Sequence, residues 1–244
     1  MNHKNKINMS NFTVDVPSCS GCKNDSKLFC CLTIDEKETL GENKGNNLYK
    51  KGQSIFYEGN QPHGLFCIFK GKVKLSKLGE NGKEQVVRFA KTGDVLGYRS
   101  LFSNEPYQAT ATAMEDTYAC HISTHNFMKV LNTNSKLSFQ AVKILSEDLK
   151  NAEQHLLNIT QKTVKQRIAE ALLILYKTFG FTEDNQTLNV SLTRQEIGDI
   201  AGTTTETTIR TLAKLKKEGV ILLYGKKIGI SNISLLANIA GIYD

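Results

Sequence analysis

The side chains best suited to chemistry in this sequence are cysteines, most of them clustered near the N-terminus. Cys19 and Cys22 form a C-x2-C pair, Cys30 and Cys31 follow in the same polar segment, and Cys120 stands alone far along the chain. Thiolates bind soft metal ions and iron–sulfur clusters, and paired thiols also undergo redox exchange. The spacing therefore indicates a metal or redox site, provided that the thiols stay reduced.

Whether the thiols stay reduced depends on the cellular compartment of the protein. The N-terminal sequence MNHKNKINMSNFTVDVP has no apolar signal core, and no apolar run reaches the length of a membrane span. We therefore expect a cytoplasmic protein whose cysteines are free thiols or metal ligands, not structural disulfides. The histidines are scattered without ligand spacing, so they do not indicate a zinc site, and haem binding stays open without support.

Structural uses of the cysteines compete with the metal or redox use. A local zinc site would need Cys30 and Cys31 together with Cys19 and Cys22, but adjacent cysteines are poor tetrahedral ligands. A lone cysteine in an apolar strand is more often a small buried residue. We expect this of Cys67, which lies between two apolar neighbours. Another metal, a redox use and no cofactor at all stay open.

A second group of polar side chains lies in residues 192–221, LTRQEIGDIAGTTTETTIRTLAKLKKEGVI. Thr193 and Glu196 form a capping box that begins a short helix, and Gly202 supplies the turn out of it. Thr204 begins a second helix. Its apolar residues recur at helical spacing: Ile209, Leu212 and Leu215. Its opposite face carries side chains suited to base edges: Thr205, Glu206, Thr207 and Arg210.

Two helices across a short glycine-containing turn form a helix-turn-helix, whose second helix lies in the DNA major groove. An ordinary amphipathic helical hairpin is the alternative. The residues that follow favour DNA binding, because Leu222–Tyr224 and Ile228–Ile230 flank Gly225-Lys226-Lys227, a β-hairpin with lysines placed for phosphates. The net charge of +7 and the pI near 9.0 agree with a polyanionic partner.

No catalytic motif accompanies these features. The chain has no P-loop, G-x-G-x-x-G, H-E-x-x-H or G-x-S-x-G sequence. We therefore expect a sequence-specific DNA-binding protein and not an enzyme, with a metal-binding redox protein as the alternative.

The chain divides into four predicted parts: a cysteine-containing arm (1–45), a β-rich domain (46–134), a long helix (135–163) and a winged helix-turn-helix domain (164–244). In the second part, short β-rich runs end at glycine turns, which is typical of an antiparallel roll or barrel. The expected strands are 54–57, 65–69, 73–78 and 85–89, with a hairpin turn at 79–82. The fold class is α+β.

The long predicted helix contains neither Pro nor Gly and carries an apolar heptad seam. The seam consists of Val142, Leu145, Leu149, Ala152, Leu156 and Ile159. Such a seam predicts a homodimer, although a helix packed on its own domain is the alternative. Two copies would present two recognition helices about one DNA turn apart and would bind near-palindromic sites.

A β-roll, a long dimer helix and a winged helix-turn-helix, in this order, resemble the Crp/Fnr family of bacterial transcription regulators. The resemblance extends from about residue 19 to the end, and is most specific in LTRQEIGDIAG, TETTIRTLAKLKKEG, GLFCIFKGKVKLSK and KTGDVLG. It implies a cyclic-nucleotide-binding-like jelly-roll domain, with DNA and RNA polymerase as partners. By resemblance, Glu206 and Arg210 are the main base-contacting residues and fit a TGA-type half-site. Thr205 and Ile209 are further reading positions, where Ile209 either contacts a thymine methyl or packs inward.

Family members that bind cyclic nucleotides carry a Gly-Glu and, about ten residues later, an Arg-Ser or Arg-Thr that binds the phosphate. Here Tyr98 stands in place of the glutamate, Gln108 and Ala109 replace the later pair, and Arg99 does not have the right strand position. We therefore expect no cyclic nucleotide.

The oxygen-sensing Fnr-like branch is the nearest in this resemblance, and it implies a [4Fe–4S] cluster held by Cys19, Cys22, Cys30 and Cys120. The branch has a C-x2-C-x5-C arm, whereas seven residues separate Cys22 from Cys30 here, a difference that a flexible arm can absorb. Cys30 and Cys31 compete for one ligand position, and Cys30 is the closer to the family spacing. Because the seam is apolar, with Ala152 at its middle, we expect a dimer that persists without cofactor.

Overall fold

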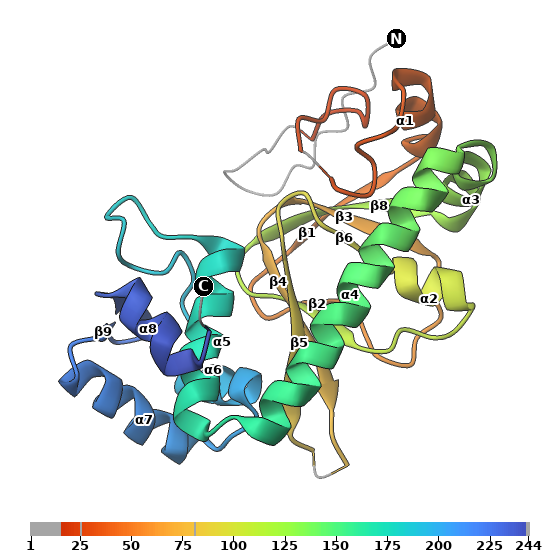
Figure 1. Cartoon of the computed structure of the whole chain (residues 1–244). Coiled ribbons are helices and arrows are strands. Elements are labelled where there is room, and N and C mark those ends of the chain that lie inside the picture. The colour runs from red at the N-terminus through yellow and green to blue at the C-terminus, as the bar shows by residue number, and fades with distance from the viewer. Residues whose placement is uncertain (1–15, 25, 81, 243–244) are drawn as a thin grey trace. The chain divides into compact units, whose positions relative to one another are not determined.

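The computed structural model describes residues 16–24, 26–80 and 82–242, which form two compact units. One unit contains the described residues up to Lys77 together with Arg88–Leu149, and the other contains Leu78–Val87 and the residues from Lys150 onward. Residues 1–15 of the predicted arm, position 81 of the predicted hairpin turn and the last two residues lie outside the described residues. Among the residues described, no helix is long and apolar enough to cross a membrane. Figure 1 labels the elements.

The first unit contains most of two antiparallel four-stranded sheets with the orders β1-β8-β3-β6 and β2-β7-β4-β5. The strands are β1 Gly45–Tyr49, β2 Ser54–Phe56, β3 Gly64–Lys70, β4 Lys72–Leu78, β5 Glu84–Lys91, β6 Val95–Leu96, β7 Thr110–Ala113 and β8 Thr117–Ser123. One cluster of buried side chains has members from both sheets, among them Phe56, Ile68 and Val73. The sheets therefore pack face to face. The predicted roll is confirmed, and the four predicted strands lie within two residues of their expected bounds.

Residues 26–40, before β1, fold onto this roll. A capping box between Thr33 and Glu36 begins α1, Ile34–Leu40. Apolar side chains of the segment join a second core cluster with Phe127 of α3, Thr124–Thr133. They are Leu28, Phe29, Leu32 and Leu40. The polar composition of residues 1–45 predicted a flexible arm, but within residues 26–40 a few spaced apolar side chains are enough to dock the segment on the roll.

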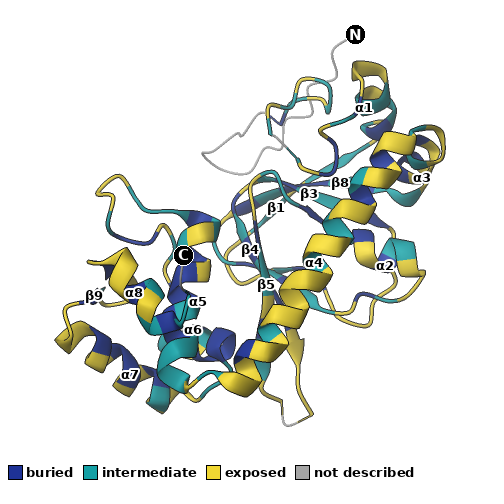
Figure 2. Cartoon of the chain, in the orientation of Figure 1, coloured by how far each residue is buried: buried dark blue, intermediate teal, exposed yellow. Residues whose placement is uncertain are grey.

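The helix α4 runs over Ser135–Gln161, close to the predicted 135–163. Three residues of the predicted seam are strongly exposed: Val142 at 58%, Leu149 at 61% and Leu156 at 64%. Ala152 and Ile159 are exposed as well, and Leu145 is half-buried against the second core cluster. Figure 2 shows exposed residues along most of α4. Within this chain, then, the seam is an apolar stripe that faces solvent.

The second unit is mainly helical. It contains α5 Val164–Phe179, α6 Arg194–Ala201, α7 Thr205–Lys217, the hairpin strands β9 Ile221–Tyr224 and β10 Lys227–Ile230, and α8 Ile233–Ala240. Fully buried side chains from each helix form its core: Ile168, Leu172, Ile197, Leu212, Leu215 and Leu236. The helices α6, α7 and α8 all pack against α5. The helices α5 and α8 were not predicted individually from the sequence, and they complete the core beneath the helix-turn-helix.

Candidate functional site

The predicted helix-turn-helix is formed by α6, a short turn and α7. The capping box at the start of α6 is present, since the Thr193 amide donates to Glu196 Oε2 at 2.7 Å and the Glu196 amide donates to Thr193 Oγ1 at 3.1 Å. The helix ends at Gly202, whose φ of +62° is in the left-handed region that glycine adopts without strain.

Gly198 permits the close approach of the two helices. A Cβ added there would lie 2.9 Å from Thr208 Oγ1 and 3.1 Å from the carbonyl oxygen of Thr203. The Thr208 hydroxyl is itself fixed, because it donates to the carbonyl oxygen of Thr204 at 2.9 Å. Any side chain at position 198 would therefore push α7 away from α6.

The outer face of α7 carries the predicted DNA-contacting residues. Exposed side chains on this face are Thr205, Glu206, Ile209 and Arg210, with Thr207 half-buried at its border. Ile209 is 51% exposed, so it does not pack inward. Of the apolar residues at helical spacing, Leu212 and Leu215 are buried and Ile209 is exposed, while Thr208 occupies the buried position one turn before Leu212.

The predicted wing is present as the antiparallel pair β9–β10. Lys226 and Lys227 are exposed at its tip, next to Gly225 with a φ of +59°. Arg194, at the start of α6, donates from Nη2 to the carbonyl oxygen of Gly225 at 2.8 Å. This bond fixes the tip of the wing relative to the helix-turn-helix.

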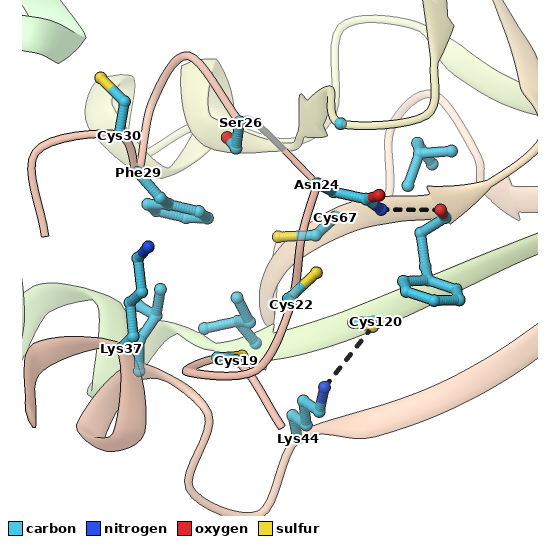
Figure 3. Close-up of a pocket in the computed structure, with 15 residues that line it drawn as sticks. Cys19, Cys22, Asn24, Ser26, Phe29, Cys30, Lys37, Lys44, Cys67 and Cys120 are labelled. Atoms are coloured by element: carbon cyan, nitrogen blue, oxygen red, sulfur yellow. Dashed lines mark hydrogen bonds between the residues drawn. The ribbon is translucent and has the colours of Figure 1, made fainter. Parts of the chain in front are cut away.

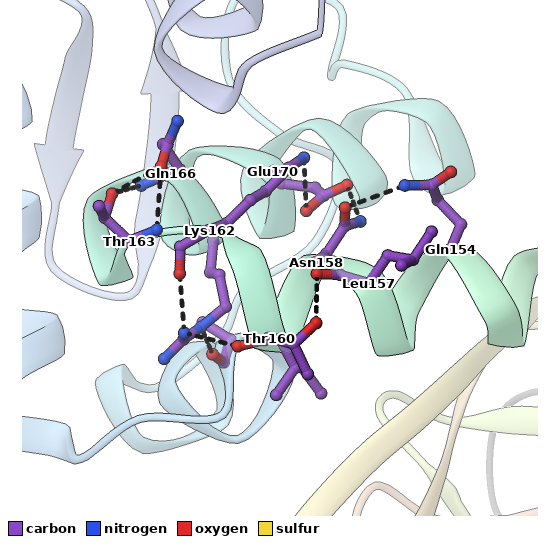
Figure 4. A network of polar contacts seen from close by, with 11 residues as sticks. Gln154, Leu157, Asn158, Thr160, Lys162, Thr163, Gln166 and Glu170 are labelled. Atoms are coloured by element: carbon purple, nitrogen blue, oxygen red, sulfur yellow. Dashed lines mark hydrogen bonds and ion pairs between the residues drawn. The ribbon is translucent and has the colours of Figure 1, made fainter.

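A polar network joins the end of α4 to the helix-turn-helix (Figure 4). Arg167 of α5 donates from Nε to the carbonyl oxygen of Ala201 at 2.8 Å and from Nη1 to that of Lys162 at 3.0 Å. Lys162 also pairs with Glu170 at 3.1 Å, and Glu170 accepts a hydrogen bond from Asn158 at 2.6 Å. No sequence motif marks these residues, and only their three-dimensional contacts show their role.

The cysteines gather around a cavity of about 180 Å³ in the first unit (Figure 3). Its lining includes all four predicted ligands, Cys19, Cys22, Cys30 and Cys120, and also Cys67. Cys31 is not among the lining residues and packs against the second core cluster. Cys67, expected as a core residue, packs against the second core cluster as predicted and also lines the cavity, which was not foreseen.

The thiols come from two kinds of element. Cys67 in β3 and Cys120 in β8 lie directly opposite each other in the sheet. Cys19 and Cys22 belong to a turn in which the Cys22 amide donates to the carbonyl oxygen of Cys19 at 3.4 Å. Asn24 anchors this turn to β3, because its Nδ2 donates to the carbonyl oxygen of Phe69 at 2.7 Å.

Burial and nearby lysines set the charge in the cavity. Burial raises the pKa of Cys120 to about 11, and it also raises that of Cys19, while the charge of Lys44 lowers both. Lys44 Nζ lies 3.9 Å from Cys120 Sγ. In the described part of the chain, no three His, Cys, Asp or Glu side chains converge on a point where one metal ion would bind. Ligands of a four-iron cluster bind different iron atoms and so need not converge on one point.

The place of the nucleotide phosphate cassette holds an internal ion-pair network. Tyr98 begins α2, Tyr98–Ser103, and its hydroxyl donates to Asp148 Oδ2 at 2.5 Å. Arg88 Nη1 and Arg99 Nη2 lie 3.2 Å and 2.7 Å from the same oxygen. A single carboxylate from α4 thus pairs with both arginines at this part of the roll.

Comparison with known proteins accounts for this combination of sites. Two family models match the chain, the cyclic nucleotide-binding domain over residues 47–134 and the Crp-like helix-turn-helix domain over residues 166–239. The fumarate and nitrate reduction regulatory protein of Escherichia coli (strain K12) is 28% identical over 211 residues, which cover 85% of this chain and 82% of that protein. The chain belongs to the Crp/Fnr family.

Two solved structures have a similar fold. FixK2 from Bradyrhizobium japonicum has a TM-score of 0.71 and 25% identity, covering 80% of this chain and 96% of that one. A Crp/Fnr-family transcriptional regulator from Thermus thermophilus has a TM-score of 0.68 and 23% identity, covering 81% of this chain and 98% of that one. Crp/Fnr proteins are DNA-binding transcription regulators and not enzymes, so this class of function is confirmed.

Proposed function

We propose that this Crp/Fnr regulator is a cytoplasmic homodimer that binds a near-palindromic TGA-type site in double-stranded DNA and acts on RNA polymerase. The exposed face of α7 is the observation that carries the proposal. Arg210 is suited to donate two hydrogen bonds to guanine, Glu206 to accept one from cytosine N4, and Ile209 to contact a thymine methyl. Thr205 and Thr207 flank them on the same helix.

The exposed seam of α4 supports the dimer. Apolar side chains that recur every three to four residues along a helix are stabilised by a second copy of the same helix. A two-fold axis along α4 would give two copies of α7 related by the symmetry of a palindrome.

A gel-shift titration against a palindromic TGA…TCA site tests the DNA contacts. Arg210→Ala removes the guanine contact, so we expect a loss of about 1–3 kcal/mol on this site and weaker discrimination against a G-to-A change. Lys216→Ala is the matched control, because Lys216 is exposed at the far end of α7 and its loss should weaken binding to all sequences alike. If Arg210→Ala binds the palindrome as well as the unaltered protein does, this use of α7 is wrong.

We further propose that the signal is read by a [4Fe–4S] cluster bound at the thiol cavity, and not by a cyclic nucleotide. The donor set fits the group: Cys19, Cys22 and Cys120 line one cavity, which Lys37 and Lys44 also line and where their charges offset the negative charge of thiolates. A bound iron–sulfur cluster that is open to solvent reacts with oxygen and so supplies redox sensitivity. A cyclic nucleotide is disfavoured because Arg88 and Arg99, which could bind its phosphate, already pair with the Asp148 carboxylate.

Anaerobic purification with iron and sulfide analysis and a visible absorption spectrum tests this second proposal. We expect a brown protein whose broad absorption bleaches in air. Colourless, iron-free protein after anaerobic cluster reconstitution would contradict it.

The apolar seam also predicts that the dimer persists when the cofactor is lost, so that the signal alters the helix-turn-helix and not the assembly. Size-exclusion chromatography of protein purified in air, at micromolar concentration, should show a dimer. Elution as a monomer would contradict this part of the proposal.

A further inference from the structure

Cys67 lies on the outer face of its sheet, where the cavity is. Its neighbour Ile68 in β3 is buried in the core between the two sheets, as is Ala119, the neighbour of Cys120 in β8. Successive side chains of a strand point to opposite faces, so Cys67 and Cys120 both point away from that core. They are also paired in register, and paired residues of antiparallel strands lie side by side on one face.

The turn that carries Cys19 and Cys22 covers this same face. Cys19, Cys22, Cys67 and Cys120 all line the cavity, and Figure 3 shows them around its lower and central part. Gly41 leaves room for Cys19, because a Cβ there would lie 2.8 Å from Cys19 Sγ.

Cys30 has different surroundings. Its side chain is exposed, and its thiol donates a hydrogen bond to the carbonyl oxygen of Lys27 at 3.2 Å within its own turn. In Figure 3 its sulfur points away from the other labelled thiols. Moving the Cys30 thiol to the cluster would break this bond and rearrange residues next to Leu28 and Phe29, which are anchored in the core.

We propose that the four thiols that hold the cluster are Cys19, Cys22, Cys67 and Cys120, with Cys67 in the position that the family spacing gives to Cys30. This assignment rests on the proposed iron–sulfur function and makes it more specific. Two ligands then come from paired strands that the roll holds rigid, and two come from one C-x2-C turn. The long spacing of seven residues between Cys22 and Cys30 then places no constraint on the cluster, because Cys30 is not a ligand.

Cysteine substitutions in the full-length protein, purified anaerobically and reconstituted with iron and sulfide, test the assignment. We expect about four iron atoms per chain in the unaltered protein and in Cys30→Ser. The Cys67→Ser variant should contain less than one iron atom per chain and lose the visible absorption. The Cys19→Ser variant should behave in the same way, because Cys19 is a ligand in both assignments. Cys67→Ala, with far-UV circular dichroism on every variant, separates loss of the cluster from loss of the fold.

Thiol labelling of the unaltered holoprotein gives a second readout that does not depend on any variant. Under anaerobic conditions, iodoacetamide should modify Cys30 at once, whereas Cys67 should react only after the iron is removed with a chelator. The assignment would be overturned if Cys30 were protected from labelling in the holoprotein. It would also be overturned if Cys30→Ser lost the cluster while Cys67→Ser and Cys67→Ala kept it. Either result would leave the iron–sulfur function intact. Iron-free unaltered protein would overturn both.

Discussion

Replacing Asp148 by Asn should destabilise the first unit by about 2–4 kcal/mol. The carboxylate accepts from Tyr98 and pairs with Arg88 and Arg99, and its side chain is only 16% exposed. A hydrogen bond to a charged group contributes about 1.5–3 kcal/mol of net stability. The Arg99 side chain is 52% exposed, so its pair is screened and contributes under about 1 kcal/mol. Most of the loss therefore comes from the contacts with Arg88 and Tyr98.

The pH dependence of this effect has a definite sign. Burial raises the pKa of Asp148, but the hydrogen bond from Tyr98 and the charges of Arg88 and Arg99 outweigh it, so the pKa lies below its ordinary value. A carboxyl with a lowered pKa in the folded state contributes its full stability above the unfolded pKa of about 3.9, and loses it as pH falls through the folded value. The difference between the two proteins should therefore be constant from neutral pH to about pH 5 and shrink in stronger acid.

Urea unfolding followed by circular dichroism, at one fixed protein concentration, measures this difference. Glu147→Gln is the matched control, because Glu147 is the neighbouring carboxylate and pairs with Lys27 only at 3.8 Å on the surface. Its loss should change stability by under about 0.5 kcal/mol. If Asp148→Asn is as stable at pH 7 as Glu147→Gln, the network does not stabilise the roll and the reasoning fails.

Three further changes test other parts of the molecule. Leu149→Asp places a charge in the exposed seam and should convert the dimer to a monomer in analytical ultracentrifugation; an unchanged sedimentation coefficient would count against the seam. Gly198→Ala should lower the stability of the helix-turn-helix by about 1–3 kcal/mol in thermal unfolding, because its Cβ overlaps the turn, and a neutral effect would contradict the close approach. Replacing Lys226 and Lys227 together by Ala should reduce the slope of log affinity against log salt by about 2, and a slope that stays the same would exclude phosphate contacts by the wing.

Local signals in the sequence were strong enough to predict most elements. The capping box at Thr193, the turn at Gly202 and the cap at Thr204 mark the two helices of the DNA-binding motif, because each acts over only a few residues. The helix α4 was equally clear, since it lacks Pro and Gly over its whole length.

The sequence was less informative where a short apolar pattern has two possible phases or faces. Ile209 shares helical spacing with the buried Leu212 and Leu215, so the sequence left open whether it faces inward or outward, and the structure shows it exposed. Cys67 has apolar neighbours on both sides, so the sequence predicted its packing in the core but not that it also lines the cavity.

Apart from the approach of Cys120 to the N-terminal cysteines, which the family resemblance implied, long-range contacts could not be predicted. The pairing of Cys67 with Cys120 joins residues from distant strands, and its chemical meaning depends on the turn that covers them. Likewise, nothing near Asp148 in the sequence indicates Arg88 or Arg99 as its partners.

Arg167 has a mechanical consequence for how any signal reaches DNA. Its guanidinium, a rigid planar fork, binds carbonyl oxygens at the C-terminal ends of both α4 and α6, where the helix dipoles are negative. Together with the Lys162–Glu170 ion pair, these hydrogen bonds hold the last turn of α4 against the helix-turn-helix. Bending at the short link between α4 and α5 would break several charge-assisted hydrogen bonds at once. The last turn of α4, the helix-turn-helix and the wing are therefore held together by direct contacts, so a change in the direction of this turn would carry the recognition helix with it.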